Sequence, residues 1–315
     1  MNFRKLIPLY TNPANFDYLH KFTVFTPVYN AESTIERVHQ SLLNQNFKDF
    51  EWLIINDGSK DKSHEVISKI IEHSPLKINY VNNAKNQHKM ACFLQAVNFA
   101  KGEFLLTFDA DDECVPEALE VFNNEYLSIP SSEKSIVSAV TGLCIDQNGN
   151  PIGSKFPTNP YFSNTFKSTA IDKITGEKWG FTKTNVLKGI VFEDEFIHNG
   201  FMKEGIIWNL LAKEGFKTKY INKTLRIYHL NVENSISSAS KRNTALGSVI
   251  QNIVNFNWFF NSYFFKSPIF FLKNLYFLLK SATHLDFQLK NYIDAIDSFI
   301  VRFFLIILWP FKRFF

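Results

Sequence analysis

Short, nearly continuous apolar runs alternate with amphipathic segments along the first 130 residues of the chain. The runs FTVFT (22–26), EWLIIN (51–56) and EFLLTF (103–108) are rich in β-branched and aromatic residues, so each predicts a buried strand. We expect the first of them to end at Pro27, and a shorter run, INYV (78–81), predicts a fourth strand.

The segments between these strands have the spacing of helices. Apolar residues of 35–42 fall on one helical face, and Ser33 and Glu36 have the spacing of a capping box at its start. Similar patterns predict helices over 66–71 and 89–100. Alternation of helices with nearly continuous apolar strands predicts an α/β fold with a mostly parallel sheet covered on both faces. In such sheets the functional groups lie in loops at the carboxyl ends of the strands.

The second half of the chain continues this pattern less regularly. Residues 136–145 (IVSAVTGLCI) predict a strand, whereas 151–175 are polar and irregular and predict a long functional loop. The segment IIWNLLAKEG (206–215) predicts a helix that its last glycine caps. KTKYIN (217–222) and LRIYH (225–229) are expected as two further strands.

The composition changes after residue 240. Residues 241–315 are crowded with Phe and carry nine Lys or Arg against three Asp. The longest uncharged apolar run, 303–311, is shorter than the roughly 18–20 residues that a membrane-spanning helix needs. This pattern favours helices lying in the interface of an anionic membrane, with Phe, Trp and Leu inserted and cations on the head groups. The alternative is a soluble helical subdomain with an aromatic core.

Overall composition narrows the class of protein. Hydrophobic residues make up 45% and charged residues 20% of the chain, which indicates a folded protein. The net charge of +4 is mild, and no nucleic-acid partner is expected. Cys92, Cys114 and Cys144 lack metal-site spacing and are predicted to be reduced, buried thiols. The apolar run near the N-terminus is too short for a signal peptide, so a cytoplasmic protein is expected.

A group of aspartates stands at the end of the strand 103–108. Asp109, Asp111 and Asp112 place three carboxylates within four residues, and their mutual repulsion would be relieved by a bound cation. Oxygen ligands without nearby Cys favour Mg²⁺ or Mn²⁺, which typically serve a phosphate-bearing substrate. Asp57, at the end of another strand, is expected to face the same crevice.

Taken together, these segments resemble a known family. TPVYNAESTIERVHQSLLNQNFKDFEWLIINDGSKD (26–61) and NQHKMACFLQAVNFAKGEFLLTFDADDECVPEALE (86–120) closely resemble the N-terminal half of family 2 glycosyltransferases with the GT-A fold. The likeness is strong over 20–125 and looser over 176–240.

The resemblance implies a Rossmann-like sheet flanked by helices and a transferase domain over 1–240. Residues 20–125 would form the nucleotide-sugar half, 126–240 the acceptor half, and 241–315 a helical region that associates with membranes. The implied activity is inverting transfer of one hexosyl or N-acetylhexosaminyl group from a nucleotide-diphosphate sugar, foremost a UDP-sugar. A divalent metal, Mn²⁺ or Mg²⁺, would assist transfer to a glycan or lipid-linked acceptor. Surface polysaccharide or lipooligosaccharide synthesis, at the inner face of the cell membrane, is the expected setting.

By the same resemblance, Pro27, Tyr29 and Glu32 line the nucleotide pocket. Asp57 would bind the nucleobase, and Asp109 would bind the ribose.

Three further residues are assigned to the diphosphate or its metal. Asp111, the second Asp of the DxD motif, would coordinate the metal, and Lys89 would reach the nucleotide or its phosphates. His229 stands where the family closes a loop over the diphosphate. It is a candidate metal or phosphate ligand, with a structural role as the alternative.

The acceptor hydroxyl needs a carboxylate base, and two positions compete for this role. Asp194 belongs to the literal Glu-Asp pair of FEDEF, but that pair precedes a turn. Glu204 opens the helix that precedes the last strands, which is where the family places its acidic motif. We favour Glu204 as the base over a helix-capping role, although its neighbour is Gly205 rather than Asp.

Rival functions remain. A processive polysaccharide synthase would need transmembrane helices and a QxxRW segment, and a sugar-phosphate nucleotidyltransferase would need a Gly-rich N-terminal signature. The sequence carries none of these. An inactive, membrane-docked scaffold that binds nucleotide is the non-enzymatic alternative.

Overall fold

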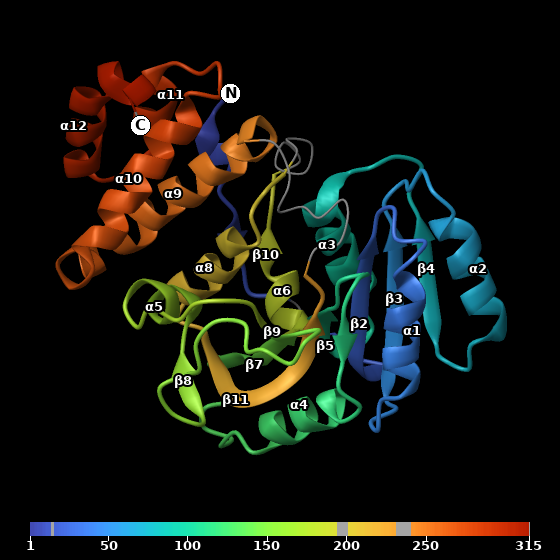
Figure 1. The fold of residues 1–315 in the computed structure, drawn as a ribbon. Helices are drawn as coiled ribbons and strands as arrows, with labels where there is room; N and C mark the ends of the chain where they lie inside the picture. Colours follow the sequence, from blue (N-terminus) through green and yellow to red (C-terminus); the bar gives the residue numbers. More distant parts are fainter. Residues whose placement is uncertain (14–15, 194–200, 231–240, 315) are drawn as a thin grey trace.

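A nine-stranded sheet forms the centre of this computed structural model, which describes residues 1–13, 16–193, 201–230 and 241–314 (Figure 1). A small second sheet pairs β1 (Leu9–Tyr10) with β10 (Ile190–Val191). In spatial order the strands of the large sheet are β4 (Ile78–Asn82), β3 (Phe50–Asn56), β2 (His20–Val28), β5 (Gly102–Thr107), β9 (Lys178–Lys183), β7 (Val137–Asp146), β11 (Lys217–Tyr228) and β6 (Glu113–Cys114), with β8 (Tyr161–Ser163) paired to β11.

The first four strands of the large sheet in chain order, β2 to β5, run parallel to one another. β2 lies between β3 and β5, and β4 pairs with β3. Val24 and Phe25 are both fully buried, but they belong to the cores on opposite faces of the sheet. The nearly continuous apolar runs therefore reflect burial on both faces, as the sequence predicted. In the second half β9 runs antiparallel to its neighbours, while β7 and β11 are parallel.

Helices cover both faces of the sheet. Residues of α1 (Ile35–Leu43), α2 (Ser63–His73) and α4 (Ala118–Leu127) fill the core on one face. The core on the other face includes residues of α3 (His88–Phe99), α5 (Thr165–Ala170), α6 (Thr184–Lys188) and α8 (Gly205–Lys213). The α/β class and the flanking helices are confirmed.

The C-terminal helices lie at one end of the molecule, where α9 packs on α8 (Figure 1). They share one core with it, and a chain of buried amides runs from Asn209 to Asn255 to Asn274, with both contacts at 2.7 Å. Within the described residues, no helix is at once long and apolar enough to cross a membrane. These elements are α9 (Lys241–Tyr263), η3 (Phe264–Lys266), α10 (Pro268–Ala282), α11 (Leu289–Ala295), α12 (Phe299–Leu308) and η4 (Trp309–Phe314), and η1 (Phe3–Leu6) packs against α11.

Aromatic residues of this region are divided between its interior and its surface. Phe256, Phe259 and Phe260 of α9 are 3–6% exposed, so they belong to the core. In contrast, most side chains of α12 are exposed, and that of Phe299 is 79% exposed. The aromatic core that a soluble helical subdomain would need is therefore present in α9 and α10. In contrast, α12 presents a large apolar surface.

Several local expectations were wrong. β2 continues through Pro27, because its pairing with β5 ends at Phe25 and proline is tolerated where a strand is paired on one side only. The two strands expected after Gly215 are one, β11, which follows β7 through register shifts between Tyr220 and Arg226. The expected loop 151–175 contains β8 and α5. Thr34 is the N-cap residue of α1 but makes no capping hydrogen bond.

Candidate active site

The carboxyl ends of β2, β3 and β5 meet at one edge of the sheet, and the loops that follow them are tied together. The N–H of Asn30 donates to Ser59 Oγ at 2.9 Å, and the N–H of Lys60 donates to Asn30 Oδ1 at 2.8 Å. Glu32 Oε2 accepts the N–H of Lys62 at 2.7 Å, while the Tyr29 side chain is 45% exposed. This edge is therefore a preformed wall with one exposed aromatic ring.

Asp57 fixes the segment that leads into α3. Its carboxylate is buried and accepts the N–H of Gln87 at 2.8 Å and the amide of Asn83 at 3.4 Å. Gly58 follows with a φ of +70°, and a Cβ there would lie 2.6 Å from the carbonyl carbon of Lys85. Asp57 and Gly58 thus set the course of residues 83–87 and place the start of α3 beside the sheet edge.

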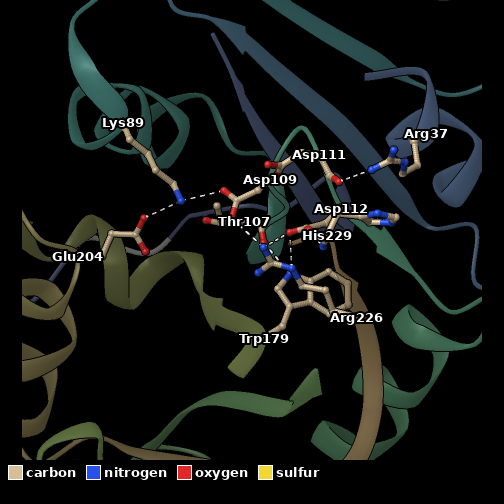
Figure 2. Close-up of polar contacts among 10 residues, drawn as sticks. All are labelled: Arg37, Lys89, Thr107, Asp109, Asp111, Asp112, Trp179, Glu204, Arg226 and His229. Atoms are coloured by element: carbon tan, nitrogen blue, oxygen red, sulfur yellow. Dashed lines mark hydrogen bonds and ion pairs between the residues drawn. The ribbon is translucent and has the colours of Figure 1, made fainter. Parts of the chain in front are cut away.

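Two internal cations compensate the aspartates at the end of β5 (Figure 2). Arg226 of β11 donates from Nε to Asp112 Oδ2 at 2.7 Å and from Nη2 to Asp109 Oδ2 at 2.8 Å. Lys89 Nζ lies 2.8 Å from Asp109 Oδ1. Burial opposes the charged form of Asp109, but these two cations hold its pKa well below the usual range. Part of the repulsion that the sequence assigned to a bound metal is thus relieved by Lys89 and Arg226.

Asp111 is the member of the cluster that keeps its carboxylate out of any ion pair among the described residues. Arg37 binds only its backbone, with Nη1 donating to the Asp111 carbonyl at 2.7 Å. Burial and the charge of nearby Asp109 raise the pKa of Asp111, so a cation at this carboxylate would be favoured. A hard oxygen donor at the strand edge fits a divalent metal that is shared with a ligand.

His229 is held against Glu113. Its Nε2 lies 2.7 Å from Glu113 Oε1, and its N–H donates to Asp112 Oδ1 at 2.9 Å. Among the residues that the structure describes, no three His, Cys, Asp or Glu side chains are grouped to hold a metal. Since Nε2 of His229 is engaged with Glu113, a metal would have to bind this side chain through Nδ1.

Glu204 faces the aspartate cluster from the other half of the molecule (Figure 2). It occupies the N-cap position of α8, but its side chain makes no capping hydrogen bond. Instead its Oε1 lies 3.1 Å from Lys89 Nζ, which also contacts Asp109. Lys89 therefore joins the candidate base to the candidate ribose ligand. Asp194, the competing position, lies outside the described residues.

The glycine after Glu204 has a structural explanation. A Cβ on Gly205 would lie 2.7 Å from Oε1 of Gln251, so the side chain of this α9 residue fills the space beside the glycine. On the same helix, a Cβ on Gly247 would lie 2.5 Å from the carbonyl oxygen of Phe201. α9 thus packs closely against the segment that carries Glu204.

Trp179 and the three cysteines have structural roles. Trp179 is buried and donates from Nε1 to the Thr107 carbonyl at 2.7 Å, between the rings of Phe108 and Phe122. The three cysteines are buried and free, as predicted.

The chain is similar in sequence to known glycosyltransferases. The family model described as Glycosyl transferase family 2 matches residues 23–179. The GalNAc(5)-diNAcBac-PP-undecaprenol beta-1,3-glucosyltransferase of Campylobacter jejuni is 25% identical over 226 residues, which cover 71% of this chain and 69% of that protein. The hyaluronan synthase of Pasteurella multocida is 31% identical over 172 residues, but the match spans only 17% of the synthase.

Solved structures have the same fold. TarS 1-349 of S. aureus, in complex with UDP-GlcNAc, superposes with a TM-score of 0.59 at 18% identity, covering 93% of this chain and 87% of that one. The mannosyltransferase PcManGT of Pyrobaculum calidifontis, in complex with GDP-Man and Mn²⁺, gives a TM-score of 0.53 at 17% identity, covering 94% and 83%. These similarities confirm the fold class expected from the sequence.

Proposed function

Because the chain belongs to glycosyltransferase family 2 and is a glycosyltransferase, we propose that it transfers one sugar from a nucleotide-diphosphate sugar, with inversion. A UDP-sugar is the proposed donor, and the UDP-GlcNAc bound by TarS supports this choice. The observation that carries the proposal is the facing of Glu204 and Asp109 across Lys89 at the edge of the sheet. Family membership argues against the nucleotidyltransferase and scaffold alternatives.

In the proposed reaction Glu204 accepts the proton of the acceptor hydroxyl as that oxygen attacks the sugar carbon. Inversion requires the base on the face opposite the leaving diphosphate. Glu204 is the N-cap residue of α8, whereas the nucleotide ligands lie on the loops after β2, β3 and β5. The two sets of residues thus come from opposite halves of the molecule, which suits an attack from the side away from the donor.

We propose that the donor lies along the strand ends. Asp109 would bind the ribose and Asp57 the base, with Pro27, Tyr29 and Glu32 lining the pocket. Asp57 already uses one oxygen to fix the loop before α3, so a nucleobase would meet a carboxylate held in place by protein contacts.

Asp111 is the proposed ligand of a divalent metal, with His229 as a second candidate. When bound, Mn²⁺ or Mg²⁺ would neutralise charge that develops on the departing diphosphate. The carboxylate of Asp111, which has no ion-pair partner among the described residues, supports this assignment, as does the Mn²⁺ in the PcManGT complex. The contact of His229 Nε2 with Glu113 leaves Nδ1 as the nitrogen that could hold a metal.

The proposed acceptor is a glycan or glycolipid of surface-polysaccharide or lipooligosaccharide synthesis. The Campylobacter relative acts on an undecaprenol-linked glycan, and a Bacillus subtilis relative of 26% identity is named as a putative teichuronic acid biosynthesis glycosyltransferase. These names support a lipid-linked acceptor. Transfer of a single sugar is proposed over processive synthesis, since this sequence carries no QxxRW segment.

We further propose that residues 241–315 place the enzyme on the inner, anionic face of the cell membrane, while 1–240 carry the transferase domain. Residues 299–314 contain no acidic side chain and include Arg302, Lys312 and Arg313. Such a combination of exposed apolar and cationic side chains is typical of interfacial helices. The exposed large apolar residues of this segment, the C-terminal apolar face, are Phe299, Ile300, Phe303, Phe304, Ile306, Ile307, Phe311 and Phe314.

The donor proposal is tested by offering a panel of nucleotide sugars with Mn²⁺ and measuring release of free nucleotide. We expect one donor class to give metal-dependent turnover, and Asp111→Asn to lose most of it. Absence of turnover with every donor, in wild type and variant alike, would contradict the proposal.

A further inference from the structure

Lys89 forms a charged contact between the two halves of the candidate active site. It is the second residue of α3, on the nucleotide side, and its ammonium lies 2.8 Å from Asp109 and 3.1 Å from Glu204 (Figure 2). Only 24% of its side chain is exposed. Burial disfavours a charged lysine, but the two carboxylates raise its pKa above the ordinary value, so it stays protonated.

The local charges show a shortage of cations. Asp109, Asp112 and Glu204 share Lys89 and Arg226, and Asp111 has no cationic partner among the described residues. Arg226 is 5% exposed and bound to two aspartates, so it has no freedom to serve a ligand. Lys89 has a flexible stem and is therefore the cation that an incoming diphosphate can recruit.

The backbone around Lys89 is fixed, so only its side chain can respond. Asp57 anchors the N–H of Gln87, and His88 has a φ of 72°, a left-handed conformation that starts the helix abruptly. The Cα of Lys89 thus stays beside the strand ends, whereas its ammonium can turn toward Glu204 or toward the phosphates.

We propose that Lys89 couples donor binding to release of the base. In the donor-free enzyme its ammonium is held by Glu204. The donor diphosphate then draws it away, which leaves the Glu204 carboxylate free for the acceptor hydroxyl. This inference rests on the proposed function, in which Glu204 is the base and the donor carries a diphosphate. The ammonium occupies the side of the Glu204 carboxylate at Oε1, so the contact keeps the acceptor hydroxyl from that oxygen until the donor arrives.

The inference makes a prediction for donor binding that needs no turnover. Wild type must break the contact between Lys89 and Glu204 to bind a diphosphate, whereas Glu204→Gln weakens that contact in advance. Glu204→Gln should therefore bind the nucleotide about two- to fivefold more tightly, the range for a partly exposed ion pair. In a Lys89→Met background the same substitution should give no gain, because the competition has been removed.

The experiment is a double-mutant cycle measured by isothermal titration calorimetry with Mn²⁺ present. UDP, GDP, CDP and dTDP are titrated into wild type, and the tightest of them is the probe for Lys89→Met, Glu204→Gln and the double variant. Lys85→Met, an exposed lysine on the same segment, is the matched control, and thermal melts confirm that each variant folds.

Three results separate the possibilities. A gain in Glu204→Gln that disappears with Lys89→Met supports the coupling. No gain, or a gain that persists with Lys89→Met, overturns it, because general charge relief would then explain the change. Failure of wild type to bind any of the four nucleotides would instead contradict the proposed function.

Steady-state kinetics add an independent readout. If the donor draws Lys89 away, Lys89→Met should raise the KM for the donor about tenfold or more and change kcat by only a few-fold. If Lys89 instead holds Glu204 in place throughout the reaction, kcat should fall while the KM for the donor stays near that of wild type, and the coupling would be wrong.

Discussion

Replacing Phe303 and Phe304 on α12 by glutamine probes the C-terminal apolar face without disturbing the core. The two side chains are 51% and 49% exposed, while Val301 and Leu305 of the same helix are buried. Glutamine is a good helix former, so α12 should persist in the variant. The ten residues of α12 span about 15 Å, too short to cross a bilayer but long enough to lie in its interface.

The expected loss of membrane affinity follows from the exposed fractions. Full burial of a phenylalanine side chain stabilises by about 1.5–3 kcal/mol. Since half of each ring is already buried in the protein, insertion would add roughly 1 kcal/mol for each ring. Loss of both should weaken partitioning by roughly 2 kcal/mol, which is about 30-fold.

The assay is co-sedimentation with vesicles, with anionic and zwitterionic lipid compared at low and high salt. The matched control is Ile71→Gln with Leu127→Gln, two exposed apolar residues on helices of the transferase domain. Wild type should bind anionic vesicles and release with salt, and the control should behave like wild type. Unchanged binding of the Phe303, Phe304 double variant would refute the reasoning, and so would a concentration-dependent dimer that the double variant abolishes.

Two further predictions concern packing around the site. Arg226→Met leaves the buried carboxylate of Asp112 without its guanidinium, so the free energy of unfolding in urea should fall by about 3 kcal/mol; a loss below about 1 kcal/mol would show that Asp112 does not depend on this cation. Gly247→Ala should lower the free energy of unfolding by about 1–3 kcal/mol, because the new methyl group meets the Phe201 backbone. In Gly205→Ala the methyl group meets only the tip of Gln251, so its free energy of unfolding should stay within about 1 kcal/mol of wild type. Equal losses for the two glycine variants would contradict the close packing of α9 on residues 201–205.

The fold was largely predictable because its signals are local. Strands such as β3, buried at every position, leave a continuous apolar run, and helices such as α1 leave an amphipathic one. Short segments also predicted the acidic end of β5 and the position of Glu204 at the start of α8. Where a sequence-based expectation was wrong, contacts with a distant segment determined the structure. For example, pairing with β7 makes residues 217–228 a single strand.

The ion pairs of the site could not have been predicted in this way. Arg226 is 114 residues from Asp112 in the sequence, and nothing in LRIYH distinguishes it from a surface arginine. Its one available signal was an arginine between apolar residues of a predicted strand. The contact of Lys89 with Glu204 likewise joins two halves of the chain, and only the fold brings them together.

The same limit applies to the C-terminal region. α9 and α12 are both rich in aromatic residues, and composition alone assigned them a common role. The structure buries the rings of α9 and exposes those of α12, so deletion of the whole region would remove core together with surface. Point substitutions on α12 are therefore the more informative test.

The central claim, that Glu204 is the base of a donor-dependent transfer, is tested most directly by measuring transfer and nucleotide binding together in Glu204→Gln. Our account predicts that transfer falls by at least about 100-fold, the contribution of a positioned general base, while the nucleotide still binds. Asp194→Asn, measured in parallel, should keep most of its activity. Near wild-type transfer by Glu204→Gln, with activity lost in Asp194→Asn, would contradict the account.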